Sequence, residues 1–402
     1  MINDRWLTSR RLRAHGLLLA LTLWGLYTWT LATPTFRDRN GNLKGTDFLH
    51  FYTLGTLAID HRGADLYDMN AQAAIAAGRV PDAEGIRYLP LYPPQVSIVF
   101  APLALLPYGL AFAVWWICTD LLYAVCCYLV WRTCASLRGR GATVGLLAAA
   151  SPALFNLIAW GQTSALALAC FTGMFFLLRA RRDFVAGLIL GCLIFKPQLG
   201  LAAAIVFLAV GAWKILAGAI LSAVAELSVG VLYYGTGPLR TWFHTLWNAQ
   251  SVVPMLEPRP YQTHCLRTFW SMIIPWAEVS LTLYVASAVG VLVCTILVWR
   301  RSQTLSLKYS ALLMATVLVS PHLTVYDLVI LAPAMILLAD WLIGLAGKTQ
   351  GVGTLLYLIY MLPLLAPVTR WTHVQPSVVA MCALLGIIWR RTLVKGLTQH
   401  PA

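Results

Sequence analysis

The stretch AEVSLTLYVASAVGVLVCTILVWRR, residues 277–301, decides the fold class of this chain. It is apolar almost throughout and ends on Arg300 and Arg301. A transmembrane helix needs about 20 mainly apolar residues, and cations collect at the cytoplasmic ends of such helices. The stretch therefore predicts a membrane-spanning helix that ends in the cytoplasm.

The whole chain has the same character. Hydrophobic residues make up 59% of the 402 residues and charged residues 11%, and the mean hydropathy is +0.73. Apolar runs recur from Leu17 to Trp389 and are continuous rather than alternating, which favours helices over a barrel. We expect an all-α polytopic membrane protein that forms a single integral-membrane domain over residues 1–402.

Basic clusters set the expected topology. The net charge is +14, but the cations stand at the ends of apolar runs, as in 179–182 and 390–391, so nucleic-acid binding is not expected. Both termini are predicted to be cytoplasmic. The expected membrane helices number about twelve and lie near 14–32, 110–131, 142–159, 163–178, 184–198, 199–214, 215–234, 277–299, 309–321, 323–341, 354–367 and 376–389.

Three further segments lie between these helices. Segment 92–107 contains Pro102 and ends at Pro107, and a full crossing would place a basic loop outside, so we expect it to be re-entrant or to lie on the surface. Residues 33–90 form the first external loop, with short amphipathic helices at 47–59 and 70–78 on the membrane surface. Residues 235–276 form the second large external loop.

This topology places the remaining polar motifs together at the external side, which predicts a binding or reaction site at the outer membrane face. These motifs are Asp47, Tyr92-Pro93-Pro94, Gly161-Gln162, Lys196-Pro197-Gln198, the loop 235–276, Ser320-Pro321-His322 and the stretch from Arg370 to His373. The nine cysteines show no CxxC pair and no His spacing typical of zinc, so no metal is expected.

Each charged motif has two interpretations. Asp47 either caps the helix that follows it or acts as a general base. Lys196 either extends along a helix end to the interface or binds an anionic phosphate. His322, with Tyr326 and Asp327 about one turn later, either closes a helix end or belongs to a site. In the second loop Arg259, His264, Arg267 and several aromatic residues suit either sugar and phosphate contacts or an ordinary interfacial belt.

The ordered set of motifs resembles glycosyltransferase family 87, a family of membrane enzymes of the GT-C type. The likeness runs from Thr46-Asp47-Phe48 through Tyr67-Asp68, Ala101-Pro102-Leu103 and the motifs above to Ser320-Pro321-His322. It implies a GT-C fold and an inverting transfer of a sugar, commonly mannose, from a polyprenyl-phosphate donor. The acceptor would be a hydroxyl of a lipid or a glycan.

The same resemblance assigns roles to residues. Asp47 would be the general base, and no cofactor or metal is implied. Our candidates for holding the donor phosphate are Lys196, His322, Arg259 and Arg267. Our candidates for contacting the substrates are His50, Tyr52, Tyr92, Gln162, Gln198 and His264.

We expect a monomer in the bacterial cytoplasmic membrane, in contact with membrane lipids, with its site facing the periplasm or cell exterior. The main alternative is a lipid-sugar flippase or transporter that uses Asp120 and Glu226, because charges within apolar runs are costly to keep. A non-catalytic scaffold in envelope assembly is a third hypothesis.

Overall fold

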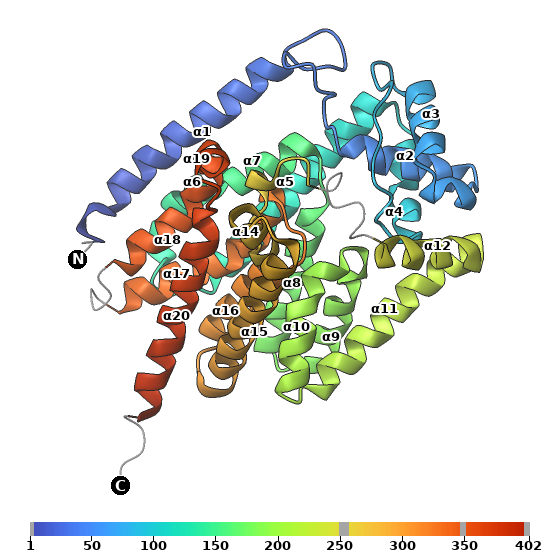
Figure 1. Ribbon diagram of the computed structural model, residues 1–402. Helices are drawn as coiled ribbons and strands as arrows, with labels where there is room; N and C mark the ends of the chain where they lie inside the picture. Colours follow the sequence, from blue (N-terminus) through green and yellow to red (C-terminus); the bar gives the residue numbers. More distant parts are fainter. Residues whose placement is uncertain (1–3, 249–256, 346–350, 398–402) are drawn as a thin grey trace.

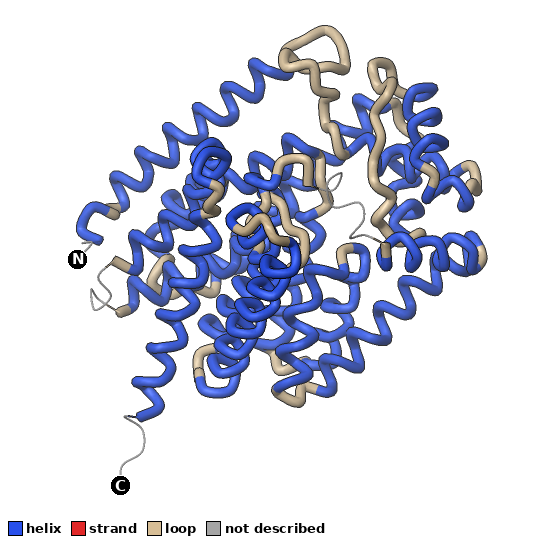
Figure 2. The backbone as a smooth tube through the Cα atoms, in the orientation of Figure 1, coloured by secondary structure: helices blue, strands red, loops and turns tan. Residues whose placement is uncertain are grey.

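The protein is all-helical in a computed structural model that describes residues 4–248, 257–345 and 351–397 (Figures 1 and 2). In these ranges there are no strands, only isolated bridges between Arg37 and Leu43 and between Thr263 and Thr324. The α-helices are α1 Ser9–Leu31, α2 Phe48–Ile59, α3 Met69–Arg79, α4 Gln95–Ala104, α5 Tyr108–Arg132, α6 Gly141–Ala149, α7 Pro152–Trp160, α8 Ser164–Arg179, α9 Asp183–Gly191, α10 Pro197–Ala209, α11 Trp213–Tyr234, α12 Thr236–Trp247, α14 Leu266–Ile273, α15 Ala277–Arg301, α16 Leu305–Val319, α17 Ala332–Gly344, α18 Val352–Met361, α19 Ala366–Thr372 and α20 Pro376–Leu397. The 3-10 helices are η1 Asp4–Trp6, η2 Gly63–Tyr67, η3 Arg138–Arg140, η4 Cys192–Phe195, η6 Pro260–Gln262, η7 Val325–Leu331 and η8 Leu362–Leu365.

Several of these helices can cross a membrane. Five described segments are long and apolar enough to do so: α5, α11, α15, η7 with α17, and α18 with α19. The pair Arg138–Ala149 and Pro152–Trp160, bent by 42°, makes a sixth if it is one span. The outer faces of α11 and α15 expose large apolar side chains such as Leu232 and Val285, which suits lipid contact. The predicted multi-pass helical protein is confirmed, and the total of about twelve spans stays a prediction.

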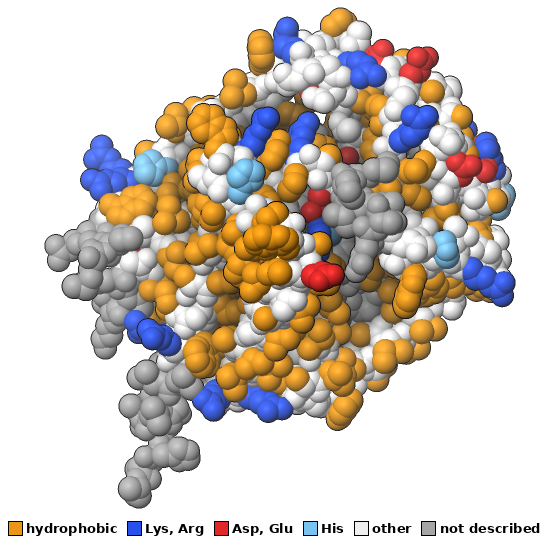
Figure 3. Space-filling view, in the orientation of Figure 1, with side chains coloured by type: hydrophobic (Ala, Val, Ile, Leu, Met, Phe, Trp, Pro, Cys, Tyr) orange, Lys and Arg blue, Asp and Glu red, His pale blue; other side chains and the backbone are white. Residues whose placement is uncertain are grey.

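The two ends of the helix bundle differ: one carries the basic residues that flank the helices, and the other carries the predicted polar motifs. Helix α8 begins next to Gln162 and ends at Arg179, and α16 begins just after Arg301 and ends just before Ser320-Pro321-His322. The predicted polar motifs and the basic anchors therefore lie at opposite ends of the same helices. Figure 3 shows apolar side chains over much of one face of the molecule, with Lys and Arg side chains at both its lower and its upper edge.

Helix α2 differs from the prediction. We expected residues 47–59 to form a helix on the membrane surface, but every residue of α2 except Ile59 is buried, including Phe48, Phe51 and Tyr52. The reason is that α2 is apolar on all sides and packs closely on α4. At Gly55 an added Cβ would lie 2.4 Å from the Phe100 carbonyl oxygen, so only glycine permits this approach.

The neighbouring helices α3 and α4 agree better with the predictions made from the sequence. Helix α3 buries Gln72 and Ala76 and leaves much of its other side exposed, as an amphipathic helix does. Helix α4 has ten residues, about 15 Å at 1.5 Å per residue and half of a bilayer core. A helix of this length is too short to cross the membrane alone, which agrees with the expectation for segment 92–107. In Figure 1 α2, α3 and α4 lie together on one side of the molecule.

Candidate functional site

Asp47 stands at the first turn of α2 and is held there by the turn that joins α7 to α8. Its backbone N–H donates to the Trp160 carbonyl oxygen at 2.9 Å. Gly161 follows with φ of +70°, a left-handed conformation, and a Cβ there would lie 2.7 Å from the Phe48 Cβ. Glycine thus meets two demands at this position, the left-handed turn and close contact with α2.

The Asp47 side chain does not cap α2, although Asp47 occupies the capping position. Instead its Oδ2 accepts a hydrogen bond from Gln162 Nε2 at 2.6 Å. Its Oδ1 has no hydrogen bond to any part of the chain that the structure describes. The cap hypothesis is therefore wrong for the side chain, and one carboxylate oxygen is left available.

Gln162 connects Asp47 to a buried polar cluster. Its Oε1 accepts from Tyr92 Oη at 3.2 Å and from Lys196 Nζ at 3.4 Å. Lys196 Nζ also donates to Ser164 Oγ at 3.0 Å and to Asp327 Oδ1 at 2.9 Å. We call Asp47, Tyr92, Gln162, Ser164, Lys196 and Asp327 the Asp47 cluster. Residues far apart in the chain thus meet in one connected network.

Lys196 is enclosed by this cluster. Only 5% of the residue is exposed, and its three N–H groups point to three protein acceptors. Asp327 balances its charge, and the Tyr326 ring lies 5.2 Å away. The Asp327 carboxylate is itself fixed by Thr324, whose backbone N–H and Oγ1 donate to Oδ2 at 3.2 and 3.3 Å. The predicted contact of Lys196 with a donor phosphate would require it to exchange one of these partners, and it stays a prediction.

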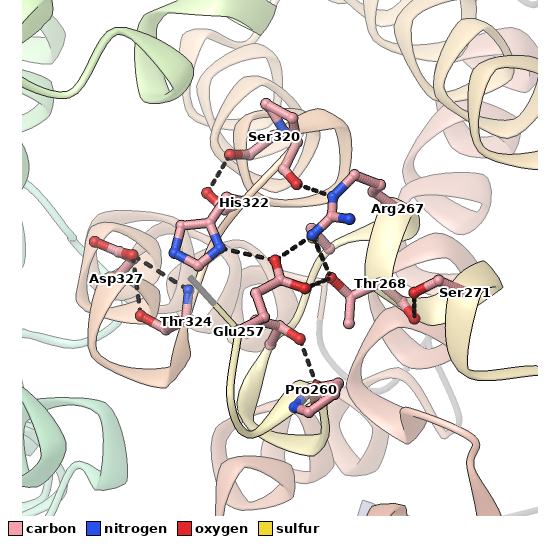
Figure 4. Close-up of polar contacts among 12 residues, drawn as sticks. Glu257, Pro260, Arg267, Thr268, Ser271, Ser320, His322, Thr324 and Asp327 are labelled. Carbon is pink, nitrogen blue, oxygen red and sulfur yellow. Dashed lines mark hydrogen bonds and ion pairs between the residues drawn. The ribbon is translucent and has the colours of Figure 1, made fainter. Parts of the chain in front are cut away.

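A second group of charges surrounds Glu257 (Figure 4). Its Oε1 accepts hydrogen bonds from Arg267 Nη2 and, at 2.7 Å, from His322 Nδ1, while Oε2 accepts from Thr268 Oγ1 at 3.0 Å. Because a carboxylate only accepts, Nδ1 of His322 carries the proton in this contact. Figure 4 shows the other ring nitrogen of His322 pointing away from Glu257, on the side where Asp327 lies.

The acids of the two groups differ in their pKa. Burial raises the pKa of Asp47 to about 6, and repulsion from Asp327 adds to this, although the Gln162 hydrogen bond and the Lys196 charge act in the opposite direction. Burial would raise the pKa of Glu257 as well, but the His322 hydrogen bond and the Arg267 charge hold it below its usual range. Glu257 is thus a fixed anion, whereas Asp47 can exchange a proton near neutral pH.

Arg259 is the most accessible of the predicted phosphate-binding residues. It is exposed and has no acidic partner in the described ranges, and its guanidinium lies 5.8 Å from the centre of the Trp160 ring. Since the Trp160 backbone binds Asp47, this cation lies close to the Asp47 cluster. Figure 3 shows basic and acidic side chains around a hollow on this face, next to residues that are not described.

The predicted substrate-contacting residues divide into two sets. Gln162 and Tyr92 belong to the Asp47 cluster, and Gln198 lies half-buried two residues after Lys196, with no hydrogen bond from its side chain in the described ranges. His50 and Tyr52 point into the core around α2. The His50 ring lies 5.1 Å from that of Tyr88, and Tyr52 Oη donates to the Leu106 carbonyl oxygen at 2.8 Å.

His264 also lies away from the Asp47 cluster. It is fully enclosed, and its Nδ1 is 2.7 Å from Ser377 Oγ. Burial lowers its pKa to about 3, so the ring is neutral at physiological pH. Its backbone N–H donates to the Leu323 carbonyl oxygen at 3.0 Å, which ties the second loop to the Ser320-Pro321-His322 segment. This bond holds the backbone directly after His322.

Sequence reasoning did not include Ser164, Glu257 and Asp327 among its site residues. Asp327 had been noticed as a neighbour of His322, but nothing in the sequence showed which cations Asp327 and Glu257 pair with. No group of three or more potential metal ligands occurs in the described residues.

These features define a multi-pass helical membrane protein with a buried acid–base cluster at one end of its bundle. The chain belongs to glycosyltransferase family 87, whose family model matches residues 91–321. The predicted resemblance to this family is therefore confirmed. The matched range contains Gln162, Lys196 and Arg259, whereas Asp47 and His322 lie outside it.

A curated relative supports the same class. The chain is 34% identical over 114 residues to the polyprenol-phosphate-mannose-dependent alpha-(1-2)-phosphatidylinositol pentamannoside mannosyltransferase of Mycobacterium tuberculosis (strain CDC 1551 / Oshkosh). The aligned part is 28% of this chain and 22% of that relative. The chain thus matches less than a quarter of the length of this relative. No solved structure matches the chain.

Proposed function

We propose that this glycosyltransferase moves a sugar, most simply mannose, from a polyprenyl-phosphate donor to a hydroxyl group of a lipid-linked or glycan acceptor. The dependence of the mycobacterial relative on polyprenol-phosphate-mannose supports this donor. We further propose a GT-C fold of about twelve membrane helices in a bacterial cytoplasmic membrane, with the site at its outer face. The position of the polar motifs opposite the basic helix ends supports this orientation.

The environment of Asp47 is the observation that carries the proposal. One carboxylate oxygen is anchored by Gln162, and the other has no partner in the described part of the chain. A pKa of about 6 keeps the carboxylate mostly ionised at pH 7 yet basic enough to take a proton. This is the combination that a general base requires.

The proposed step is a single displacement. Asp47 Oδ1 accepts the proton of the acceptor hydroxyl as its oxygen attacks C1 of the donor sugar. The bond between C1 and the phosphate oxygen breaks on the opposite face, and its electron pair leaves with the polyprenyl phosphate. Attack and departure on opposite faces invert the configuration at C1.

Departure of the phosphate requires positive charge close to it. Arg259 is exposed and unneutralised, so it is the first candidate in the described structure. Arg267 and His322 share the anion Glu257, so they are the next candidates. Lys196 is best placed to act through Gln162, by orienting the amide that holds Asp47.

The Asp47→Asn variant tests the proposal. Purified protein would be incubated with polyprenyl-phosphate mannose and membrane lipids, and products identified by mass spectrometry. Loss of a general base typically slows a reaction by about 10²–10⁴-fold, and Asp60→Asn, an acid at the far end of the same helix, should leave the rate unchanged. Full transfer activity in a folded Asp47→Asn variant would contradict the proposal.

The transporter hypothesis has less support. Asp120 is exposed on α5 and Glu226 is half-buried on α11, and neither bonds to the Asp47 cluster in the described ranges. If the protein is a flippase, Asp120→Asn with Glu226→Gln should abolish movement of a lipid-linked sugar across vesicles. Unchanged glycosyl transfer in that double variant would favour the enzyme.

A further inference from the structure

A large apolar cavity runs from the basic end of the bundle toward η7, and none of the residues that line it belongs to the Asp47 cluster. It has a volume of about 270 Å³ and is bordered by α5, α6, α17 and α18. Most of its wall is aliphatic, including Leu147, Met335, Ile336 and Leu356, and the remainder includes tyrosines such as Tyr357 and two serines. An apolar cavity of about 150 Å³ stays dry and binds benzene, so one of this size has room for a chain of about ten carbons.

The cavity is elongated along the bundle. Helix α17 lines it from Ala332 to Ile343, a distance of about 16 Å at 1.5 Å per residue. One leaflet of a bilayer has a hydrocarbon thickness of about 15 Å, half of the 30 Å core. The length therefore fits an extended hydrocarbon chain that crosses one leaflet.

One end of the cavity carries a cation that is not neutralised. Arg140 lines the cavity at the start of α6, is exposed, and has no acidic partner in the described ranges. The two nearby acids are occupied by backbone N–H groups. Asp4 accepts from Gly351, Gly353 and Thr354, and Asp340 accepts from Ser136 and Leu137.

More positive charge lies beside this end. Helix α1 packs on α6, with Gly16 against Leu146, and the residues one to two turns before Gly16 include Arg10, Arg11 and Arg13. An anionic headgroup at Arg140 would thus meet a basic surface and the N-terminal end of α6.

We infer that the cavity binds one acyl chain of an anionic phospholipid, with the lipid phosphate at Arg140. The aliphatic wall and the leaflet-matched length select a hydrocarbon chain, and the unpaired cation at its basic end selects a negatively charged headgroup. The opposite end is bordered by Leu328 and Val329 of η7, the segment that presents Asp327 to Lys196. The bound acyl chain thus packs against Leu328 and Val329 of η7 and contacts no residue of the Asp47 cluster.

The test uses the full chain in nanodiscs that contain equal amounts of phosphatidylglycerol and phosphatidylcholine with identical acyl chains. After release into detergent, native mass spectrometry counts the lipids that each protein retains. Wild-type protein should retain phosphatidylglycerol in preference to phosphatidylcholine by about fivefold. A cation near an anionic headgroup contributes about 1 kcal/mol, and in phosphatidylcholine the choline ammonium cancels the phosphate charge.

Two kinds of variant separate the chain from the headgroup. Ala339→Trp, and Ala148→Phe from the opposite wall, fill the cavity and should remove the retained lipid, whereas Val289→Trp on the exposed face of α15 should not. Arg140→Gln should abolish the preference for phosphatidylglycerol but keep a bound lipid. Arg301→Gln, another cation at the basic end, should change neither.

Three results would overturn the inference. One is equal lipid retention by folded cavity-filling variants and wild type. The second is an unchanged headgroup preference in Arg140→Gln. The third is displacement of the lipid by added polyprenyl phosphate, which would assign the cavity to the donor chain. All three readouts count bound lipid, so they do not depend on the proposed glycosyl transfer.

Discussion

Replacing Gln162 with leucine should move the acid limb of the pH–rate profile upward, because this amide stabilises the ionised form of Asp47. In the wild-type protein the pKa of Asp47 is raised to about 6, and activity should fall below that pH as the base is protonated. At pH 5 only about one tenth of the carboxylate would be ionised. The Gln162 hydrogen bond to Oδ2, at 2.6 Å, is one of two contacts that oppose this rise.

The size of the effect follows from this one hydrogen bond. A hydrogen bond to a charged group contributes about 1.5–3 kcal/mol, and about 1.4 kcal/mol corresponds to one pH unit. Since leucine is similar in size but cannot donate, the acid limb should shift upward by about one to two pH units. The Lys196–Asp327 ion pair does not depend on Gln162, so the site should keep its main charges.

The assay is kcat/KM for mannose transfer from polyprenyl-phosphate mannose, measured between pH 5 and 9 in nanodiscs. Asn156→Leu is the matched control, because within the described ranges this amide on α7 donates only to the Pro152 carbonyl oxygen of its own helix. Its profile should coincide with that of the wild type. An acid limb that stays near pH 6 in Gln162→Leu, or moves down, would refute the assignment of Asp47 as the titrating base.

Three further predictions concern the other charges. Lys196→Met should lower the free energy of unfolding by about 3–5 kcal/mol, because it leaves Asp327 buried and unpaired. In melting experiments the double variant Lys196→Met with Asp327→Leu should recover much of the lost stability. A double variant as unstable as Lys196→Met would contradict the pairing. Glu257→Gln and Arg267→Gln should each destabilise the protein, and their double-mutant cycle should show a coupling free energy of about 0.5–3 kcal/mol. If the two losses of stability simply add, the ion pair contributes nothing. Arg259→Gln should lower kcat/KM for the donor about tenfold, which corresponds to about 1.4 kcal/mol. The control is Arg370→Gln, which replaces an arginine 5.9 Å from the Tyr261 ring and should leave kcat/KM unchanged. Equal losses in the two variants would argue against a specific phosphate contact.

The helices and the polar end of the bundle could be predicted from the sequence because their causes are local. A continuous apolar run must form a helix in lipid, whatever its neighbours are, and basic residues at the ends of runs orient it. The run 277–299 became α15, and Gln162, Lys196 and His322 proved to lie at the same end of their helices. The ordered motifs were also sufficient to predict the family that residues 91–321 match.

The pairing of charges could be seen only in the tertiary structure. Lys196 had been expected to face a substrate phosphate, yet its nearest anion is Asp327, 131 residues later in the chain. Asp47 had been a possible helix cap, yet its partner is Gln162, 115 residues away. The burial of α2 likewise depends on Gly55 meeting the Phe100 backbone. Local spacing determines which side chains share a helix end, whereas packing between helices determines which of them come within 3 Å, and the pKa of Asp47 depends on that packing.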